Sequence, residues 1–298
     1  MARMSPLKKR QELWAYAFLA VPIIFFLWIR IYPVFSSFHL SLLKWDIFSS
    51  EKPFVGFANF KRMLTDKTFH KAMVNTFKYI IICMPISLSL SLAIALMMNG
   101  IKRFVGFFRT LYFIPYVTSV VAVAAVWKWM FMKSGGLINN IITSIGFSAQ
   151  PFMNSTTQSL PVIAANIIWQ GLGFQIIIFM AGLKQIPRTF YEAADIDGAN
   201  KWQAFRNITI PLLNSTIVYL SVMAGIQTLQ VFTQIFAISP GGSGGPLNST
   251  MSMVLYIYQK AFKSFDMGYA SAMTVVLFVI IMTVSLIQMK LVTKKVVY

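Results

Sequence analysis

The chain has 298 residues, of which 57% are hydrophobic and only 11% are charged, and its mean hydropathy is +0.68. Soluble domains usually carry about 25% charged residues, so this composition excludes an ordinary cytosolic enzyme, a disordered chain and a disulfide-rich secreted scaffold. The net charge of +18 comes from 26 basic and 8 acidic residues. Because the basic residues lie mostly between long apolar runs, contact with anionic lipid headgroups explains the excess better than binding to nucleic acid.

Six charge-poor windows are long enough to cross a bilayer, which takes about 20 mainly apolar residues per helix. The first follows the basic cluster Lys8 to Arg10, and no small-residue cleavage site closes it, so we expect a retained helix rather than a signal peptide. A glycine-rich segment follows the fifth window and marks its end. The expected spans are 13–35, 75–98, 108–130, 160–183, 211–238 and 267–289. They predict an all-α, polytopic membrane protein with one transmembrane domain over residues 1–298.

The orientation follows from the basic residues that flank the spans. Six spans place both termini on one side of the membrane, and the basic residues near both ends favour the cytoplasm for that side. Those at the C-terminal end are Lys290, Lys294 and Lys295. We therefore expect a multi-pass plasma-membrane protein with cytoplasmic termini and an inward-facing loop at 184–206, although the outward loop at 36–73 also carries basic residues.

Several kinds of reactive site are missing from the sequence. The expected spans hold no Asp, Glu or His at their centres, which disfavours a proton-coupled carrier or an ion pump. Clustered metal ligands are also absent from them. The glycine-rich segment at 241–246 lacks the lysine of a phosphate-binding loop. We therefore expect a chain that is not an enzyme, that holds no metal or cofactor, and that depends on another protein for its energy.

The loop between the fourth and fifth spans holds three of the eight acidic residues, Glu192, Asp195 and Asp197. The alanines beside Glu192 favour a short helix, and Gly198 can end that helix in a left-handed turn. A second short helix can follow from residue 201 to 205. These features suit either an ordinary solvated loop or an element that docks on a partner.

The spacing in this loop resembles the signature of permease subunits of bacterial ABC importers. That signature reads Glu-Ala-Ala, three residues, Gly, nine residues, then Ile-x-Leu-Pro. Matching positions are Glu192, Ala193, Ala194, Gly198, Ile208 and Pro211, and the one departure is Ile210 in place of leucine. Segments 54–60 and 244–250 are similar to segments of carbohydrate permeases of the maltose and glycerol-phosphate type, which pair with a different second permease. The resemblance extends from about Leu13 to the C-terminus.

This resemblance implies the fold of a type I importer permease and a division of labour among several chains. Two ATPase subunits would bind ATP and magnesium, a second and non-identical permease would complete the pathway, and an extracytoplasmic binding protein would deliver a sugar. This chain itself would bind no cofactor. The loop would act as a coupling helix that docks in a cleft on the ATPase, through Glu192, Ala193, Ala194, Asp195, Asp197 and Gly198.

The fourth and fifth spans carry amide, hydroxyl and aromatic side chains that suit a sugar. The resemblance places sugar contacts at Gln170, Gly171, Phe174, Ala224, Thr228 and Val231, with Gln227 and Gln230 beside them. Ala224 and Val231 are apolar where the maltose version is polar, so the same disaccharide contacts do not follow. The alternative is that these polar side chains form hydrogen bonds between helices or with the partner permease.

Three other functions remain open. The same machinery could carry an amino acid, a polyamine or phosphate, although the carbohydrate-type segments at 54–60 and 244–250 argue against it. A self-contained secondary carrier or channel would transport without an ATPase. A membrane-embedded enzyme would need a catalytic cluster that the spans lack.

Overall fold

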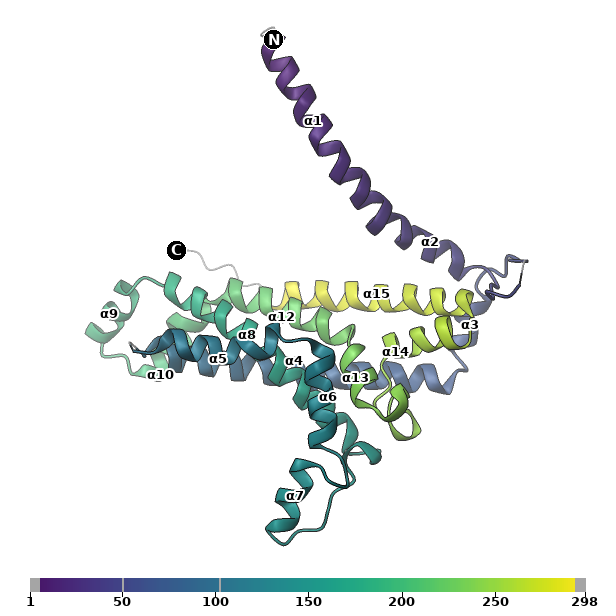
Figure 1. Ribbon diagram of the computed structural model, residues 1–298. Helices are drawn as coiled ribbons and strands as arrows, with labels where there is room; N and C mark the ends of the chain where they lie inside the picture. Colours follow the sequence, from purple (N-terminus) through teal and green to yellow (C-terminus); the bar gives the residue numbers. More distant parts are fainter. Residues whose placement is uncertain (1–5, 50, 102, 293–298) are drawn as a thin grey trace. The chain divides into compact units, whose positions relative to one another are not determined.

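The computed structural model describes residues 6–49, 51–101 and 103–292 (Figure 1), so the predicted basic residues Lys294 and Lys295 lie outside the described part. The described chain is helical, and its only β-structure is two isolated bridges, between Leu43 and Phe54 and between Asp46 and Asp266. The chain divides into two compact units, which are described separately. One contains the N-terminal part up to Thr65 together with Ile257–Val276, and the other contains Asp66–Tyr256 and the chain from Leu277 onward.

Two long helices, α4 (Lys67–Asn99) and α8 (Ser159–Gln185), form the centre of the larger unit. The carboxylate of Asp66 caps α4 by accepting hydrogen bonds from the backbone N–H groups of Thr68 and Phe69, at 2.9 and 3.1 Å. The chain at Tyr112 packs closely against α8 because Gly173 has no Cβ atom. A Cβ atom at this position would clash with the Tyr112 backbone. A core of apolar side chains joins the ends of these helices to residues 213–220: Ala95, Met98, Ile176, Phe179, Met180, Leu183, Leu213 and Leu220.

Two of the expected spans are broken helices. Residues 108–130 form α5 (Val105–Val117) and α6 (Val120–Met130), which meet at 93°. Pro115 lacks an N–H group and weakens the helix just before the bend, and Thr118 and Ser119 adopt extended ψ angles of 146° and 125°.

Residues 211–238 are likewise divided, into α11 (Ile210–Leu212), α12 (Asn214–Leu229) and α13 (Thr233–Ile238). The segment Lys201–Leu212 meets α12 at 68°. Between α12 and α13, the backbone leaves helical geometry at Phe232, with φ −138° and ψ −60°. The hydroxyl of Ser252 donates a 2.7 Å hydrogen bond to the carbonyl of Val231. This bond satisfies a backbone group at a break that is buried in the protein, which is where a membrane protein tolerates irregular backbone.

Four described helices are long and apolar enough to cross a membrane, and the number rises to six if each bent pair counts as one span. The four are Arg10–Ser41, Lys67–Asn99, Ser159–Gln185 and Met267–Leu291. This architecture confirms the prediction of an all-α, polytopic membrane fold. Hydropathy alone suggests continuous spans, because no charged residue interrupts the sequence at either bend.

Two asparagine side chains fix loop segments of the larger unit through hydrogen bonds to backbone groups. Asn139, in α7 (Leu137–Ser144), donates to the carbonyls of Met132, Lys133 and Gln150 and accepts from the Gln150 N–H at 2.8 Å. Asn75 of α4 donates to the carbonyls of Asn248 and Met251, at 2.9 and 3.1 Å, and so ties down the glycine-rich loop before α14 (Met253–Tyr258).

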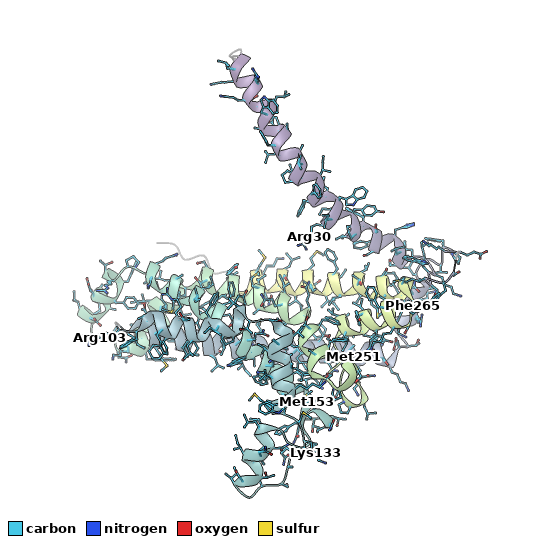
Figure 2. The ribbon with its side chains drawn as sticks, viewed as in Figure 1. Arg30, Arg103, Lys133, Met153, Met251 and Phe265 are labelled. Carbon is cyan, nitrogen blue, oxygen red and sulfur yellow. The ribbon has the colours of Figure 1, made fainter. Side chains whose placement is uncertain are left out.

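The smaller unit begins with α1 (Pro6–Phe26), a π-helical turn (Leu27–Ile31) that contains Arg30, and α2 (Tyr32–Ser41). Figure 2 shows side chains projecting along the full length of this helix, and none of its most apolar window is buried inside the protein. In α3 (Ala58–Met63), the Asn59 amide donates hydrogen bonds to the carbonyls of Ser41 and Leu43. Arg62 of the same helix forms an ion pair with Asp266 at 2.6 Å. Asp266 directly precedes α15 (Met267–Val292).

Candidate functional site

The acidic loop forms the two short helices that the sequence predicts, α9 (Thr189–Ile196) and α10 (Lys201–Ala204). Gly198 ends α9 in the left-handed conformation, with φ +74°. The Ala199 N–H donates to the Ala194 carbonyl at 2.9 Å and the Gly198 N–H to the Asp195 carbonyl at 3.2 Å, which is a Schellman motif. The left-handed helix end that the sequence predicts at Gly198 is therefore confirmed.

The second helix starts with a capping box, in which Asn200 and Gln203 bond to each other's backbone N–H groups at 2.8 and 2.9 Å. The hydroxyl groups of Tyr191 and Thr209 lie 3.0 Å apart and connect α9 to the π-helical turn at Phe205–Thr209. The loop is therefore an ordered helical element rather than an unstructured connection.

Five of the six predicted coupling residues lie at the surface of this element: Glu192, Ala193, Asp195, Asp197 and Gly198. Ala194 is buried, so it packs α9 against its own chain. None of the three carboxylates makes an ion pair with another described residue. Two apolar side chains missing from the predicted set are also exposed, Ile196 at 87% and Trp202 at 67%. The signal that could have found them is large apolar residues in a charged loop outside the spans.

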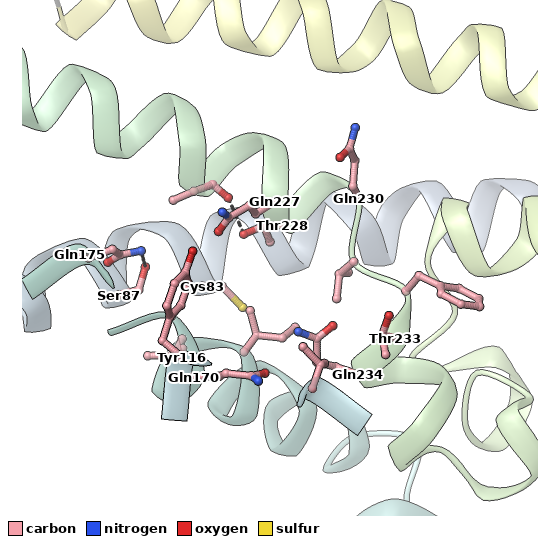
Figure 3. A pocket seen from close by; sticks show the side chains of 17 residues that line it. Cys83, Ser87, Tyr116, Gln170, Gln175, Gln227, Thr228, Gln230, Thr233 and Gln234 are labelled. Carbon is pink, nitrogen blue, oxygen red and sulfur yellow. Dashed lines mark hydrogen bonds between the residues drawn. The ribbon is translucent and has the colours of Figure 1, made fainter. Parts of the chain in front are cut away.

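A cavity of about 360 Å³ lies within the larger unit, among α4, α8, α12 and the start of α13 (Figure 3). Seven of the eight positions that the resemblance suggests for sugar contacts line it: Gln170, Gly171, Ala224, Gln227, Thr228, Gln230 and Val231. The eighth, Phe174, is not part of the lining and instead stacks on Tyr116, with ring centroids 5.2 Å apart. Tyr116 does line the cavity, so Phe174 supports an aromatic face there.

Other lining residues come from parts of the chain for which the sequence analysis made no site prediction. They are Cys83 and Ser87 on α4, and Tyr116 and Val120 at the bend between α5 and α6. Three more polar residues also line the cavity, and they are Gln175, Thr233 and Gln234. The cavity is thus built by four stretches of sequence, of which only two carried a recognisable polar pattern.

Some lining side chains already have partners within the protein. Gln175 accepts a 2.7 Å hydrogen bond from the Ser91 hydroxyl and donates to the Ser87 hydroxyl at 3.3 Å. The single proton of the Ser91 hydroxyl is shared between Gln175 and the Ser87 carbonyl, which is also an acceptor for it. The Thr228 hydroxyl donates to the Ala224 carbonyl at 2.7 Å. For Gln175, the alternative role of linking two helices therefore describes the observed contacts.

The amide of Gln170 differs, because it is buried and has no partner. The residue is only 6% exposed, and neither its nitrogen nor its oxygen makes a hydrogen bond with any described residue. Asn166, one turn earlier on α8, is fully buried and equally unpaired, but it does not line the cavity. Leaving a buried polar group unpaired costs about 1–3 kcal/mol. Figure 3 shows Gln170 and Gln234 at one side of the cavity and Gln227 and Thr228 at the other.

The described residues contain no group of His, Cys, Asp or Glu side chains that could hold a metal ion. None of the 17 lining residues carries a charge. The cavity therefore offers amides, hydroxyls, one thiol and an aromatic face, which suit a polar ligand with many hydrogen-bonding groups.

Comparisons with known proteins identify the class. Residues 86–298 match the family described as "binding-protein-dependent transport system inner membrane component". The chain is 36% identical over 285 residues to the probable ABC transporter permease YesP of Bacillus subtilis, covering 95% of this chain and 91% of that protein. It is 32% identical over 288 residues to the lactose transport system permease LacF of Rhizobium radiobacter, covering 95% of each.

The fold is also similar to that of a chain in a solved bacterial ABC transporter involved in import of the acidic polysaccharide alginate. That match has a TM-score of 0.83 at 24% identity and covers 97% of this chain and 98% of the other. The chain therefore belongs to the family of inner-membrane components of binding-protein-dependent transport systems. As a member of this family it is a multi-pass transport subunit of an ABC importer rather than an enzyme.

Proposed function

We propose that this chain is the permease subunit of an ATP-driven importer that moves a sugar or oligosaccharide, delivered by an extracytoplasmic binding protein. The observation that carries the proposal is the uncharged cavity lined by amides and hydroxyls, in which Gln170 has no internal partner. Sugar hydroxyl groups can both donate to and accept from such side chains. The name of LacF, a lactose permease, supports the same cargo class.

The proposed pathway passes the cavity, with contacts at Gln170, Gly171, Gln227, Thr228 and Val231. Phe174 acts indirectly, by holding the ring of Tyr116. Residues 1–298 form one permease domain in this proposal, and both termini lie in the cytoplasm with the acidic loop.

The proposed coupling site is the exposed face of the acidic loop. Its predicted residues are Glu192, Ala193, Ala194, Asp195, Asp197 and Gly198. Glu192 can pair with a basic residue on the ATPase, because its carboxylate is exposed and forms no ion pair with another described residue. Ile196 and Trp202 add apolar contact area, and Gly198 keeps the turn between the two short helices.

The proposed assembly contains this chain, a second and different permease, two ATPase subunits and the binding protein, within the lipid bilayer. ATP and magnesium bind to the ATPases, and nucleic acid has no part in it. Closure of the ATPases would drive the permeases between inward-open and outward-open states through the coupling loop.

Reconstitution of the complete complex in liposomes tests the proposal. We expect sugar uptake that requires ATP, the binding protein and both permeases, and Glu192→Lys should reduce uptake without reducing membrane insertion. Transport by this chain alone would indicate a secondary carrier instead. Stimulation by amino acids and by no sugar would assign a different cargo to the same machinery.

A further inference from the structure

A second cavity, of about 350 Å³, lies in the larger unit beside the junction between α6 and α7. Two lysines line it, Lys128 and Lys133, together with the exposed polar residues Ser134 and Asn154. Most of the other lining residues are apolar, and Figure 2 labels one of them, Met153, near Lys133. Neither lysine forms an ion pair with another described residue. The cavity therefore combines two positive charges with an apolar lining.

The stretches of chain that build this cavity contain no carboxylate. No Asp or Glu occurs in residues 67–191 or 198–265, and every lining residue belongs to one of these two ranges. Lys128 lies in the last turn of α6, where the helix dipole also favours a cation. Lys133 lies beyond the end of that helix, so the dipole does not account for it. A ligand with a negative charge would be attracted by both lysines and repelled by no lining residue.

One buried side chain joins the two walls of the cavity. The Asn139 amide donates to the carbonyls of Met132 and Lys133, which belong to one wall. It also bonds in both directions to the backbone of Gln150, which directly precedes the other wall at residues 151–154. The backbone that carries Lys133 is thus fixed before a ligand arrives, which lowers the cost of ordering the site on binding.

The cavity lies where we expect the surface of a membrane. α5 packs along the spanning helix α8, and α6 meets α5 at 93°, so α6 runs along the plane of a bilayer rather than across it (Figure 1). α8 begins directly after the wall at residues 151–154 and ends next to the coupling loop, so the cavity is on the side opposite to that loop. The cluster Trp127, Lys128 and Trp129 is typical of a membrane–water interface.

The exposed side of α7 is apolar. Leu137, Ile141 and Ile145 follow one another at intervals of four residues, which places them along one side of the helix and its end. They are 40%, 52% and 65% exposed. Residues 134–183 contain no charged side chain. An apolar helical face beside basic residues is the pattern of a segment that lies at the boundary between headgroups and acyl chains.

We propose that this cavity is a phospholipid site, in which Lys128 and Lys133 bind the headgroup phosphate and the apolar side of α7 lies against the acyl chains. Phosphate oxygens accept hydrogen bonds, and lysine ammonium groups only donate them. A lipid fits better than free phosphate because most of the lining is apolar. It fits better than an acidic protein surface because the lysines adjoin an uncharged apolar helix and two interfacial tryptophans. The inference goes beyond sugar transport, and rests on the proposed function only in calling this side extracytoplasmic.

The experiment uses the complete purified transporter in a neutral detergent. The probe is phosphatidylglycerol with a photoactivatable diazirine in one acyl chain. Illumination attaches the probe to the protein, and mass spectrometry identifies the labelled peptides. Unlabelled phosphatidylglycerol, phosphatidylcholine and soluble glycerol phosphate compete with the probe in separate samples. Because the measurement involves no transport, its failure would leave the proposed function standing, and a failure of sugar uptake would leave the lipid site standing.

We expect labelling within residues 137–147 that unlabelled phosphatidylglycerol abolishes. Phosphatidylcholine should need about a tenfold higher concentration, because its choline cation opposes the lysines. Glycerol phosphate should not compete even at about a hundredfold excess, because it lacks acyl chains. Competition by glycerol phosphate as strong as by the lipid would overturn the proposal in favour of a free-phosphate site. Absence of labelling there would overturn it too, and would indicate that another subunit covers α7.

A double substitution tests the role of the two lysines. Lys128→Gln together with Lys133→Gln should weaken competition by phosphatidylglycerol about thirtyfold. The control pair is Lys67→Gln with Lys71→Gln, which removes two exposed lysines near the start of α4 and should leave the competition unchanged. Equal weakening in both pairs would refute the site, because net charge alone would then explain it. Unchanged lipid labelling with weaker association of the binding protein would assign the lysines to protein docking instead.

A single substitution tests the role of α7. Ile141→Gln places an amide where we expect acyl chains and should reduce labelling about tenfold. The matched control is Asn140→Gln, at an exposed polar neighbour, which should label like the natural chain. Both positions are exposed, so neither change disturbs the core. Undiminished labelling of Ile141→Gln would show that α7 does not contact the acyl chains and would overturn the proposed binding mode.

Discussion

The same substitution at two positions of α8 should change stability in opposite directions. Gln170 and Gln175 are both 6% exposed, both line the cavity and lie five residues apart on one helix. Gln175 makes two hydrogen bonds with Ser87 and Ser91, whereas Gln170 makes none with described residues. Methionine keeps the unbranched shape of glutamine and removes the amide, so it isolates the effect of the polar group.

The expected magnitudes follow from these contacts. Gln170→Met removes two buried, unpaired polar atoms, each of which costs about 1–3 kcal/mol, so we expect a gain of about 2 kcal/mol in the free energy of unfolding. Gln175→Met removes two hydrogen bonds worth about 1 kcal/mol each, while the Ser87 and Ser91 hydroxyls keep their backbone acceptors, so we expect a loss of about 2 kcal/mol.

Thermal unfolding of the purified complex in detergent measures both variants. A change of 1 kcal/mol moves the midpoint by roughly 2–4 °C for a domain of about this size, so the two variants should separate by several degrees on opposite sides of the natural protein. Two shifts of the same sign would refute the reasoning, because they would show that Gln170 has a partner comparable to those of Gln175.

Three further predictions concern the proposed coupling loop, the segment around α7 at residues 132–150, and helix packing. Trp202→Ala should change stability by less than about 0.5 kcal/mol, because the ring is exposed, yet reduce ATP-dependent uptake; unchanged uptake would remove Trp202 from the coupling surface. Asn139→Ala should lose about 3 kcal/mol of local stability, which would appear as roughly hundredfold faster hydrogen exchange in residues 132–150. The control is Asn140→Ala, which should leave the exchange unchanged because Asn140 is exposed. Similar exchange in both variants would contradict this prediction. Gly173→Ala should destabilise the protein, because the new methyl group would overlap the carbonyl oxygen of Tyr112, a backbone atom that cannot swing aside, and unfolding at the natural temperature would argue against that packing.

Local sequence features predicted several elements correctly because the responsible forces act over a few residues. Gly198 ends a helix through hydrogen bonds between nearby backbone groups. Apolar runs of about 20 residues identify helices that can lie in lipid whatever their neighbours are. The motif at Glu192 to Pro211 also lies in consecutive sequence, so its helices and turn could be predicted without a tertiary structure.

Breaks within apolar segments could not be located in the same way. At Thr118 and at Phe232 no charged residue interrupts the segment, although the backbone changes direction there. What permits the second break is the Ser252 hydroxyl, which reaches the Val231 carbonyl from 21 residues away. Hydropathy does not contain that information, since it records only the side chains within the segment.

By itself, the sequence determined that this is a helical membrane protein and that its acidic loop forms two short helices. Only the tertiary structure decided which side chains meet: Cys83, Ser87 and Tyr116 join the cavity from segments with no polar pattern of their own. It also distinguished Gln170 from Gln175, two identical residues on one helix. The physical reason is that a hydrogen bond depends on a partner within about 3 Å, and here that partner comes from a distant part of the chain.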